Sequence, residues 1–371
     1  MSVCGRLMAG LATLGISGVA AALPATAAET RNFVVSMFAP ASYNVEGDCS
    51  KGINIPVGEQ YMRELLAVGY TKEALDKLAE GQDTTMFGGF NSQWGRAVVW
   101  RAKINGKPVN VWVNPAATPD PNLNTLDGKI GIGFDLDGKG PDQPNAFEDP
   151  LTHEKGVDNQ YFRATGCFTV FRGDEKITPG AYLSAWSILQ GGMPAWLISL
   201  SGEDLSKDGD VTVTFDMAVE HVERDAQSEV LRDMTFRINS DPRNHHEFAA
   251  QMKDNIISFK EPGDLVAIFG EEMAYPTLLL RQARLRLQIK PDGTLRGVVG
   301  GYQPWKDALS AGNQANMGSD WVGVYYNLRK SADANPDPKT GENQDISTAF
   351  FIDAVPAFSV APAKSKKITG R

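Results

Sequence analysis

The chain has 371 residues, of which 42% are hydrophobic and 22% are charged, so it is long enough and apolar enough to bury a sizeable core. Its 36 basic and 45 acidic residues give a formal net charge of -9. This charge disfavours binding to nucleic acid and is compatible with a cation or a neutral ligand.

The first 28 residues have the composition of a secretory signal peptide. Arg6 carries the only charged side chain, residues 7–23 are apolar or small, and a small-residue stretch ends in Ala27 and Ala28. We expect cleavage after Ala27 or Ala28 and a mature protein in the periplasm or outside the cell. The alternative for this run is a membrane anchor; no later segment is long and apolar enough to span a bilayer.

Two cysteines remain after removal of the signal peptide, which contains Cys4. Cys49 and Cys167 form an even pair in an oxidising compartment, so we expect a disulfide between them. Neither belongs to a C-x-x-C pair, which argues against thiol chemistry and against a cysteine-based metal site.

Residues 29–95 form the N-terminal segment, irregular over 29–57 and helical over 59–81 with a break at Gly69. The β signals begin after it. Residues 98–104 and 107–113 flank Asn105-Gly106, a pair that tolerates the positive φ of a tight hairpin turn.

Two further segments alternate apolar and polar residues, over 210–220 and 283–290, and the second turns at Pro291-Asp292-Gly293 before returning. Such strands bury one face and belong to antiparallel sheets. We therefore predict a mainly β fold, an antiparallel β-sandwich or jelly roll over 96–360, with a short helical N-terminal element. We also predict a short helix at 245–255, a polar loop at 331–345, a last strand at 349–358 and a disordered basic tail at 361–371. If the β region consists of two packed subdomains, we expect them to divide near 238–248.

An acidic segment begins with the sequence FDLDGKGPD at residues 134–142. Hard cations such as calcium prefer several carboxylate, amide and carbonyl oxygens, and glycines let the backbone turn toward the ion. Lys139 and Ala146 replace oxygen ligands that an EF-hand requires, so the expected site is of another type. We predict a structural calcium site with the ligands Asp135, Asp137, Asp142, Asp158 and Asn159. The alternative is a solvated acidic loop shaped by Asx-turns.

Other residues give weaker signals. His245 and His246 could form a transition-metal site, His245 could act as a general base, or both could be an exposed polar pair at the start of a helix. His153 could be an additional metal ligand or an exposed side chain. No G-x-S-x-G, phosphate-binding or H-E-x-x-H motif is present. Tyr302 and Trp305 follow a strand in the sequence GGYQPW and serve either as a stacking platform for a ligand or in core packing.

Three segments resemble a group of secreted, mostly proteobacterial β-rich proteins: FDLDGKGPD together with GVDNQYFRATGC (within 134–167), LRLQIKPDGTLRGVVGGYQPW (285–305) and ADANPDPKTGENQDISTAFFIDAVPAF (332–358). The resemblance implies export from a bacterial cell and implies no activity. We expect a binding protein of the cell envelope whose partner is a small molecule, a glycan or an envelope protein. The alternative is a secreted hydrolase acting on glycans or esters through Asp or Glu residues and His245.

Overall fold

The computed structural model describes residues 28–55, 63, 65–67, 69–79, 103–108, 115–117, 119–168, 171–172, 194–268, 277–314 and 321–361. Residues 1–27 of the predicted signal peptide and 362–371 of the predicted tail lie outside them. Strands hold many more of the described residues than helices do, so the predicted mainly β class is confirmed. No helix in this described part is long and apolar enough to cross a bilayer.

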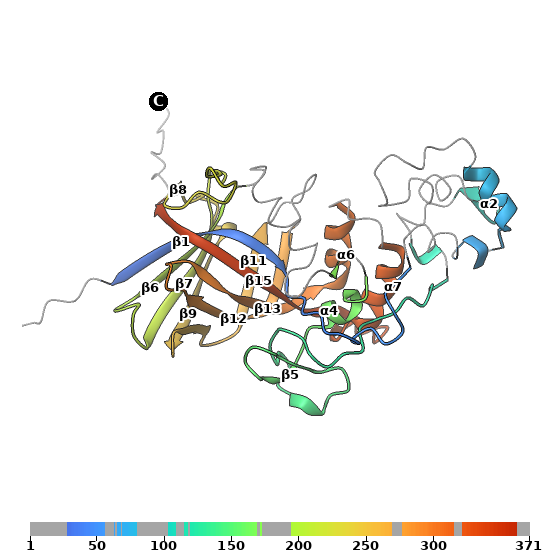
Figure 1. Cartoon of the computed structure of the whole chain (residues 1–371), viewed down its shortest axis with the longest axis horizontal. Helices are drawn as coiled ribbons and strands as arrows, with labels where there is room; N and C mark the ends of the chain where they lie inside the picture. The colour runs from blue at the N-terminus through green and yellow to red at the C-terminus, as the bar shows by residue number, and fades with distance from the viewer. Residues whose placement is uncertain are drawn as a thin grey trace, which may run out of the picture.

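Eight antiparallel strands form one sheet that closes on itself as a barrel (Figure 1). The last strand closes it, because β15 pairs with β13 along one edge and with β1 along the other. The predicted sandwich or jelly roll of two packed sheets is therefore not confirmed. In order around the barrel the strands are β1 (Glu29–Pro40), β6 (Trp196–Gly202), β7 (Gly209–Met217), β9 (His245–Lys253), β10 (Ile256–Phe259), β12 (Thr277–Ile289), β13 (Leu295–Pro304) and β15 (Asn343–Val360).

Three shorter strands extend this sheet at its margins. They are β8 (Thr235–Arg237), β11 (Gly263–Ile268) and β14 (Ala334–Pro336). The segment 238–248 includes the start of β9, which pairs directly with β7, so the residues before and after this segment share one barrel.

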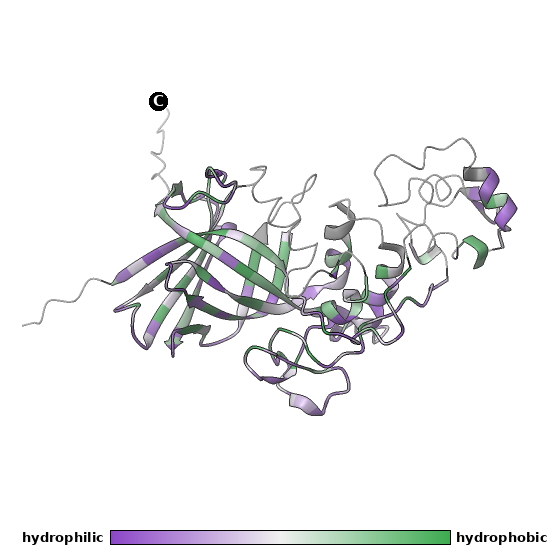
Figure 2. Ribbon diagram, viewed as in Figure 1, coloured by the Kyte–Doolittle hydropathy of each residue, from purple (hydrophilic) through white to green (hydrophobic). Residues whose placement is uncertain are grey.

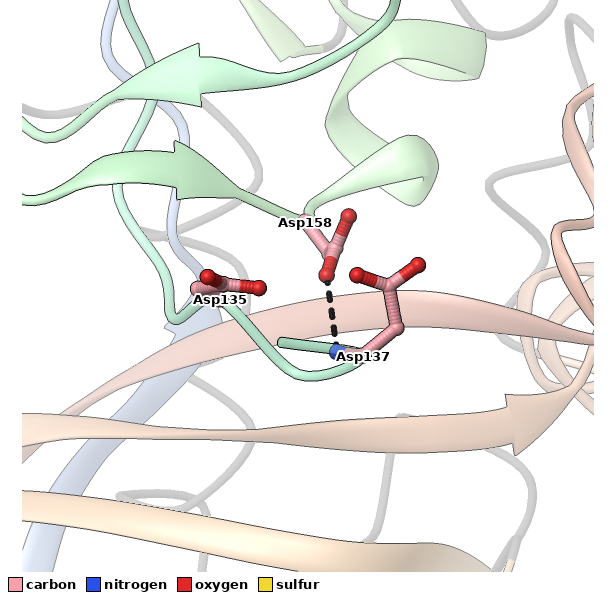
Figure 3. Close-up of side chains that lie close together, drawn as sticks. All are labelled: Asp135, Asp137 and Asp158. Atoms are coloured by element: carbon pink, nitrogen blue, oxygen red, sulfur yellow. Dashed lines mark hydrogen bonds between the residues drawn. The ribbon is translucent and has the colours of Figure 1, made fainter. Parts of the chain in front are cut away.

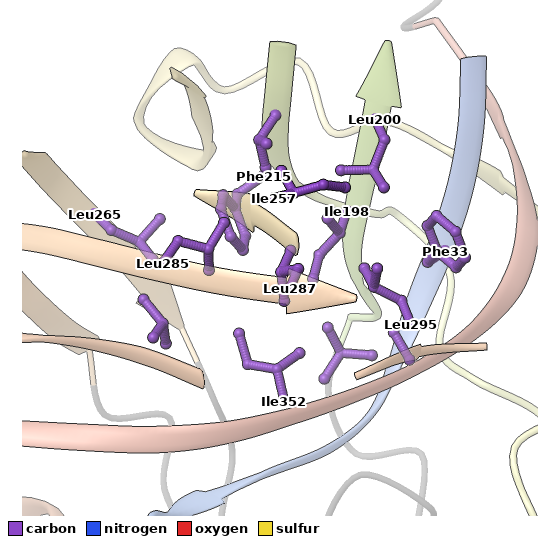
Figure 4. Packing of buried hydrophobic residues seen from close by; sticks show 14 of the residues in the cluster. Phe33, Ile198, Leu200, Phe215, Ile257, Leu265, Leu285, Leu287, Leu295 and Ile352 are labelled. Carbon is purple, nitrogen blue, oxygen red and sulfur yellow. The ribbon is translucent and has the colours of Figure 1, made fainter. Parts of the chain in front are cut away.

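The interior of the barrel is apolar because successive side chains of a strand point to opposite faces, and the apolar residues occupy the positions that face inward. On β12 the side chains of Ala283, Leu285 and Leu287 are buried, whereas the arginines between them point outward. Figure 2 shows the same alternation of hydropathy along the other strands, and Figure 4 shows the inward side chains meeting in one cluster. The alternation predicted for 210–220 and 283–290 is thus confirmed in β7 and β12.

Two sequence predictions are wrong about strands. Residues 29–40 form β1, although a period of two is hard to see there because a bulge between Val35 and Met37 shifts the register. Residues 245–253 form β9 instead of a helix, with His246, Phe248, Ala250 and Met252 directed toward the interior. Polar residues at the start of β9 mask this alternation in the sequence.

The turns agree with the sequence where they are described. Asn105 and Gly106 both have positive φ, 52° and 75°, between the short strands β2 (Lys103–Ile104) and β3 (Lys107–Pro108). Gly69, with a φ of 100°, separates the helical residues 65–67 from α2 (Lys72–Ala79). The rest of the predicted hairpin and helices lies outside the described residues.

Three helices lie beside one end of the barrel (Figure 1): α4 (Gln160–Thr165), α6 (Trp305–Gln314) and α7 (Trp321–Ser331). They share a second core that includes Phe168, Trp305, Val324 and Leu328. The predicted disulfide is present: Cys49 and Cys167 are joined, with their Cα atoms 5.9 Å apart, and it ties the segment after β1 to the end of α4.

Candidate functional site

The acidic segment is clamped to the outer face of the barrel by an arginine of β12. Arg286 Nη2 lies 2.6 Å from Asp149 and donates to the Gly133 carbonyl at 2.7 Å, and Arg286 Nη1 lies 2.6 Å from Glu154. Asp149 is fully buried, so its charge depends on this partner. The arginine face of β12, which the sequence predicts to be solvated, is covered here by the acidic segment.

The DLDG turn is held by hydrogen bonds to its own carboxylates. The two oxygens of Asp135 accept the amides of Gly138 and Gly140, at 2.8 and 3.2 Å. Both glycines have positive φ, near 70°, which a side chain would strain. The Asp137 carboxylate binds the Lys139 ammonium at 2.7 Å and accepts from Gln143. The Asp135 bonds, with that from the Lys139 amide to Asp137, are backbone-to-carboxylate contacts of the kind that shape a solvated acidic loop, and they exist beside the carboxylate cluster.

Three of the five predicted metal ligands come together. One carboxylate oxygen from each of Asp135, Asp137 and Asp158 lies within 4.8 Å of the others (Figure 3). Asp158 comes from the segment before α4, and its Oδ2 accepts the amides of Leu136 and Asp137 at 2.9 and 3.3 Å. This link fixes the turn against α4, and a cation is one way to relieve the repulsion between the carboxylates.

Burial makes Asp158 the most perturbed member of the cluster. Only 5% of the residue is exposed. Desolvation, then the negative charge of Asp137, raises the pKa of its carboxyl from 3.8 to about 7. A proton is therefore the second way in which this cluster relieves its repulsion.

The other two predicted ligands are not brought into this carboxylate cluster, and Asn159 stays a prediction. Asp142 lies in the short 3-10 helix Gly140–Asp142, is exposed and does not join the cluster. Asn159 is the N-cap of α4: its Oδ1 accepts the Phe162 amide, and its Nδ2 donates to the carbonyls of Ile132 and Ala41. The Asn159 side chain therefore has a structural role as a helix cap and backbone anchor.

A cavity of about 640 Å³ adjoins the cluster. Its wall combines the acidic segment and α4 with residues 122–125 and the end of α7. Six carboxamides line it: Asn122, Asn124, Gln143, Asn145, Gln160 and Asn343. Three carboxylates line it as well, from Asp137, Asp158 and Asp333. Hydroxyl-rich ligands are recognised by such groups, because an amide both donates and accepts hydrogen bonds.

The protein orients most of these amides through hydrogen bonds from their side-chain nitrogens. Five of them donate from the side-chain nitrogen: Asn122 to Asp120 O, Asn124 to Lys51 O and Gly52 O, Gln143 to Asp137, Gln160 to Asn145 O, and Asn343 to Ala332 O. Among the described residues, none donates a hydrogen bond to the side-chain oxygens of these five. The described part of the chain thus leaves five amide oxygens of the lining residues without a hydrogen-bond donor.

Three of the four cations of the cavity wall, Lys139, Lys330 and Arg163, are bound to protein groups. Lys139 binds Asp137, and Lys330 lies 2.6 Å from Asp120. Arg163 donates to the carbonyls of Leu126 and Asn145, and burial lowers its pKa to about 10. Lys51 lies near Asp127, whose pKa its charge helps to lower.

Asp333 is a site residue that the sequence does not single out. It follows α7 and accepts hydrogen bonds from the amide and the hydroxyl of Ser347, at 2.8 and 2.7 Å. Its carboxyl lines the cavity and stays open to it, but surrounding protein desolvates it and raises its pKa from 3.8 to about 6. The polar composition of 331–345 indicates only a loop, so no sequence signal brings Asp333 to Asp158.

The disulfide supports the opposite wall. The amide of Asn54 donates to the Cys167 carbonyl at 2.8 Å, and the Asn124 amide donates to the Asn54 side chain at 2.7 Å. Asn124 in turn holds the carbonyls of Lys51 and Gly52. Cys49 and Cys167 thus connect this part of the wall to α4.

The remaining candidates do not line the cavity. Tyr302 and Trp305 are 8% and 4% exposed within two core clusters, so they serve packing and offer no open stacking platform. His245 Nδ1 lies 2.8 Å from Asp216 at the start of β9, and no hydrogen bond joins it to a described serine, threonine or cysteine. His153 is an exposed side chain near Glu148.

No family model matches the chain, and neither a curated protein nor a solved structure matches it. The function of the protein has therefore to be inferred from the geometry and chemistry of the cavity.

Proposed function

We propose that this protein is a ligand-binding protein of the bacterial cell envelope, and that the cavity binds a small hydroxyl-rich ligand such as a carbohydrate. The observation that carries the proposal is the set of carboxamides whose nitrogens are held by the protein and whose oxygens face no described donor. A preorganised wall of acceptors favours a ligand with many donors, because its side chains need little reordering on binding.

A calcium ion on Asp135, Asp137 and Asp158 is the second part of the proposal. Since Asp137 and Asp158 also line the cavity, the ion would sit in its wall, where ligand hydroxyls can complete its coordination. The ion would then contribute to ligand binding in addition to holding the turn.

The test is calorimetric titration of the mature protein with a panel of neutral oligosaccharides, in calcium and in chelator. Gln160→Met removes one amide of the wall with little change in volume. Gln251→Met, at an exposed position of β9 outside the cavity lining, is the matched control. We expect at least one oligosaccharide to bind, with affinity lowered about tenfold by Gln160→Met only. Absence of binding in both buffers, or equal effects of the two variants, would contradict the proposal.

A glycan hydrolase is the second candidate, favoured by two carboxyl groups of raised pKa on one cavity, near 7 for Asp158 and near 6 for Asp333. Glycosidases use such a pair, one protonated and one ionised. Release of reducing ends from an oligosaccharide that binds, lost in both Asp158→Asn and Asp333→Asn, would establish hydrolysis. Binding without release would leave the protein a receptor.

A further inference from the structure

The cavity end beside α7 carries the carboxylate of Asp333. Asp333 forms no ion pair among the described residues, and its hydrogen bonds come from the neutral groups of Ser347. Lys139 is near enough for its pKa to be raised by the charge of Asp333, but its ammonium is bound to Asp137 at 2.7 Å. A carboxylate that is open to the cavity can accept a charge-assisted hydrogen bond from a positively charged ligand group.

The helix that precedes Asp333 adds to this negative potential. Helix α7 has 11 residues and ends at Ser331, and the C-terminal end of a helix carries partial negative charge on its unpaired carbonyls. The two basic residues of its last turn bind elsewhere: Arg329 to Glu342 and Lys330 to Asp120. Neither therefore neutralises the helix end at the cavity.

A neutral acceptor completes the arrangement. Asn343 also lines the cavity, and its nitrogen donates to the carbonyl of Ala332, the residue before Asp333. Its side-chain oxygen receives no hydrogen bond from a described residue. Helix end, carboxylate and amide oxygen thus present acceptors at one place, and an ammonium group offers three donors with a positive charge.

We propose that the ligand of the cavity carries an amine, and that its ammonium group binds Asp333 at the end of α7. The inference rests on the proposed carbohydrate-binding function and narrows the ligand class to amino sugars. It leaves Asp135, Asp137 and Asp158 to the calcium ion, because Asp333 is not part of that cluster.

The test compares two disaccharides that differ at their two nitrogens: two β-1,4-linked glucosamine units, which carry positively charged amines, and the same molecule N-acetylated on both nitrogens, which carries neutral and bulkier amides. Both are titrated into the mature protein in calcium. We expect the free amine to bind at least about tenfold more tightly, which is the usual effect of a charge-assisted hydrogen bond. Added salt should reduce this preference.

Asp333→Asn keeps an oxygen for Ser347 but removes the charge, and should abolish the preference without abolishing binding of the acetylated sugar. Asp353→Asn is the control, because Asp353 binds Arg296 on the barrel and does not line the cavity. Circular dichroism confirms that both variants fold. Equal binding of the two sugars, or a preference that survives Asp333→Asn, overturns the inference and leaves the carbohydrate site standing. Failure of both sugars and of every neutral oligosaccharide overturns the site as well.

Discussion

Arg286 on β12 and Glu154 of the acidic segment are 2.6 Å apart, and the other oxygen of Glu154 accepts the backbone amide of Asp135. The barrel is therefore linked to the cluster of Asp135, Asp137 and Asp158 through the side chains of Arg286 and Glu154. Asp149, on the second branch of the same guanidinium, also accepts the amides of Leu151 and Thr152. One arginine thus fixes both ends of the acidic segment.

Replacing this arginine by an apolar residue should be costly. Arg286→Met leaves Asp149 buried without its partner, for which we expect a loss of about 3–5 kcal/mol in the free energy of unfolding. Denaturant unfolding measures it. Arg296→Met, which removes an exposed pair with Asp353, should cost less than about 1 kcal/mol. Similar losses in the two variants would show that the clamp has no special role.

Asp158 predicts a specific pH dependence of stability in the absence of metal. Its carboxyl has a pKa of about 7 in the folded protein and 3.8 in the unfolded chain, so the folded state holds the proton more tightly. The free energy of unfolding should therefore fall as pH rises from about 4 to about 7, by at most about 1.4 kcal/mol per pH unit from this group.

Asp333 contributes in the same direction, up to a pH of about 6. Asp158→Asn should flatten the slope most strongly above that value, where Asp158 alone still titrates. Denaturant unfolding in chelator at a series of pH values measures this. If the free energy of unfolding of the unmutated protein rises over the same pH interval, and its pH dependence is the same in Asp158→Asn, the raised pKa of Asp158 is refuted.

Calcium should raise the melting temperature of the mature protein relative to chelator, because a ligand of the native state stabilises it by mass action, by about 2.7 kcal/mol at a hundredfold excess over Kd. The double variant Asp135→Ala/Asp137→Ala should lose the response. Asp142→Ala, exposed and outside the cluster, should keep it. Identical melting in calcium and chelator, with no retained metal by elemental analysis, would refute the calcium site.

Removal of the disulfide should destabilise the protein and loosen one wall of the cavity. Cys49 and Cys167 are separated by 118 residues, for which the chain-entropy model gives roughly 4–5 kcal/mol. Cys49→Ala/Cys167→Ala tests this by denaturant unfolding, and hydrogen exchange at the amide of Asn124 reports on the wall. Exchange there that does not change, measured where the variant is still folded, would separate the disulfide from the cavity.

Gly297 on β13 has no space for a side chain. A Cβ there would lie 1.9 Å from the Arg286 carbonyl oxygen, a backbone atom of the neighbouring strand. Gly297→Ala should therefore lower the free energy of unfolding by about 3 kcal/mol or more. Gly209→Ala, where a Cβ meets nothing within 4 Å, should be nearly neutral, and the pair is compared by thermal melting. A stable Gly297→Ala would mean that β12 and β13 separate more easily than their pairing suggests.

Strands with a regular period of two are predictable from the sequence, and β7 and β12 occur where the alternation indicates. Closure of the sheet into a barrel is not predictable in this way, because alternation shows which face of a strand is buried but does not show which strand edges pair. The bulge in β1 and the polar start of β9 hide two barrel strands for the same local reason.

The carboxylate cluster of the site is predictable from the sequence, whereas the rest of the cavity lining is not. Asp135 and Asp137 share one turn, and Asp158 returns to it, so carboxylate density in the sequence is enough to find them. Asn159 has the right chemistry for a ligand but is spent as a helix cap. Asp333 lies 175 residues beyond Asp158 in the chain, counting from 158 to 333, and only the packing of α7 beside the barrel brings it to the cavity.

The pairing of β1 with β15 has a kinetic consequence. Ser36 donates to the Asp353 carbonyl across 317 residues, so the first strand has to wait for the last one before the ring is complete. Contacts so remote in sequence make folding slow, on a scale from milliseconds to seconds, and leave apolar edges open meanwhile. During synthesis the barrel has to remain incomplete until residues 343–360 have emerged from the ribosome.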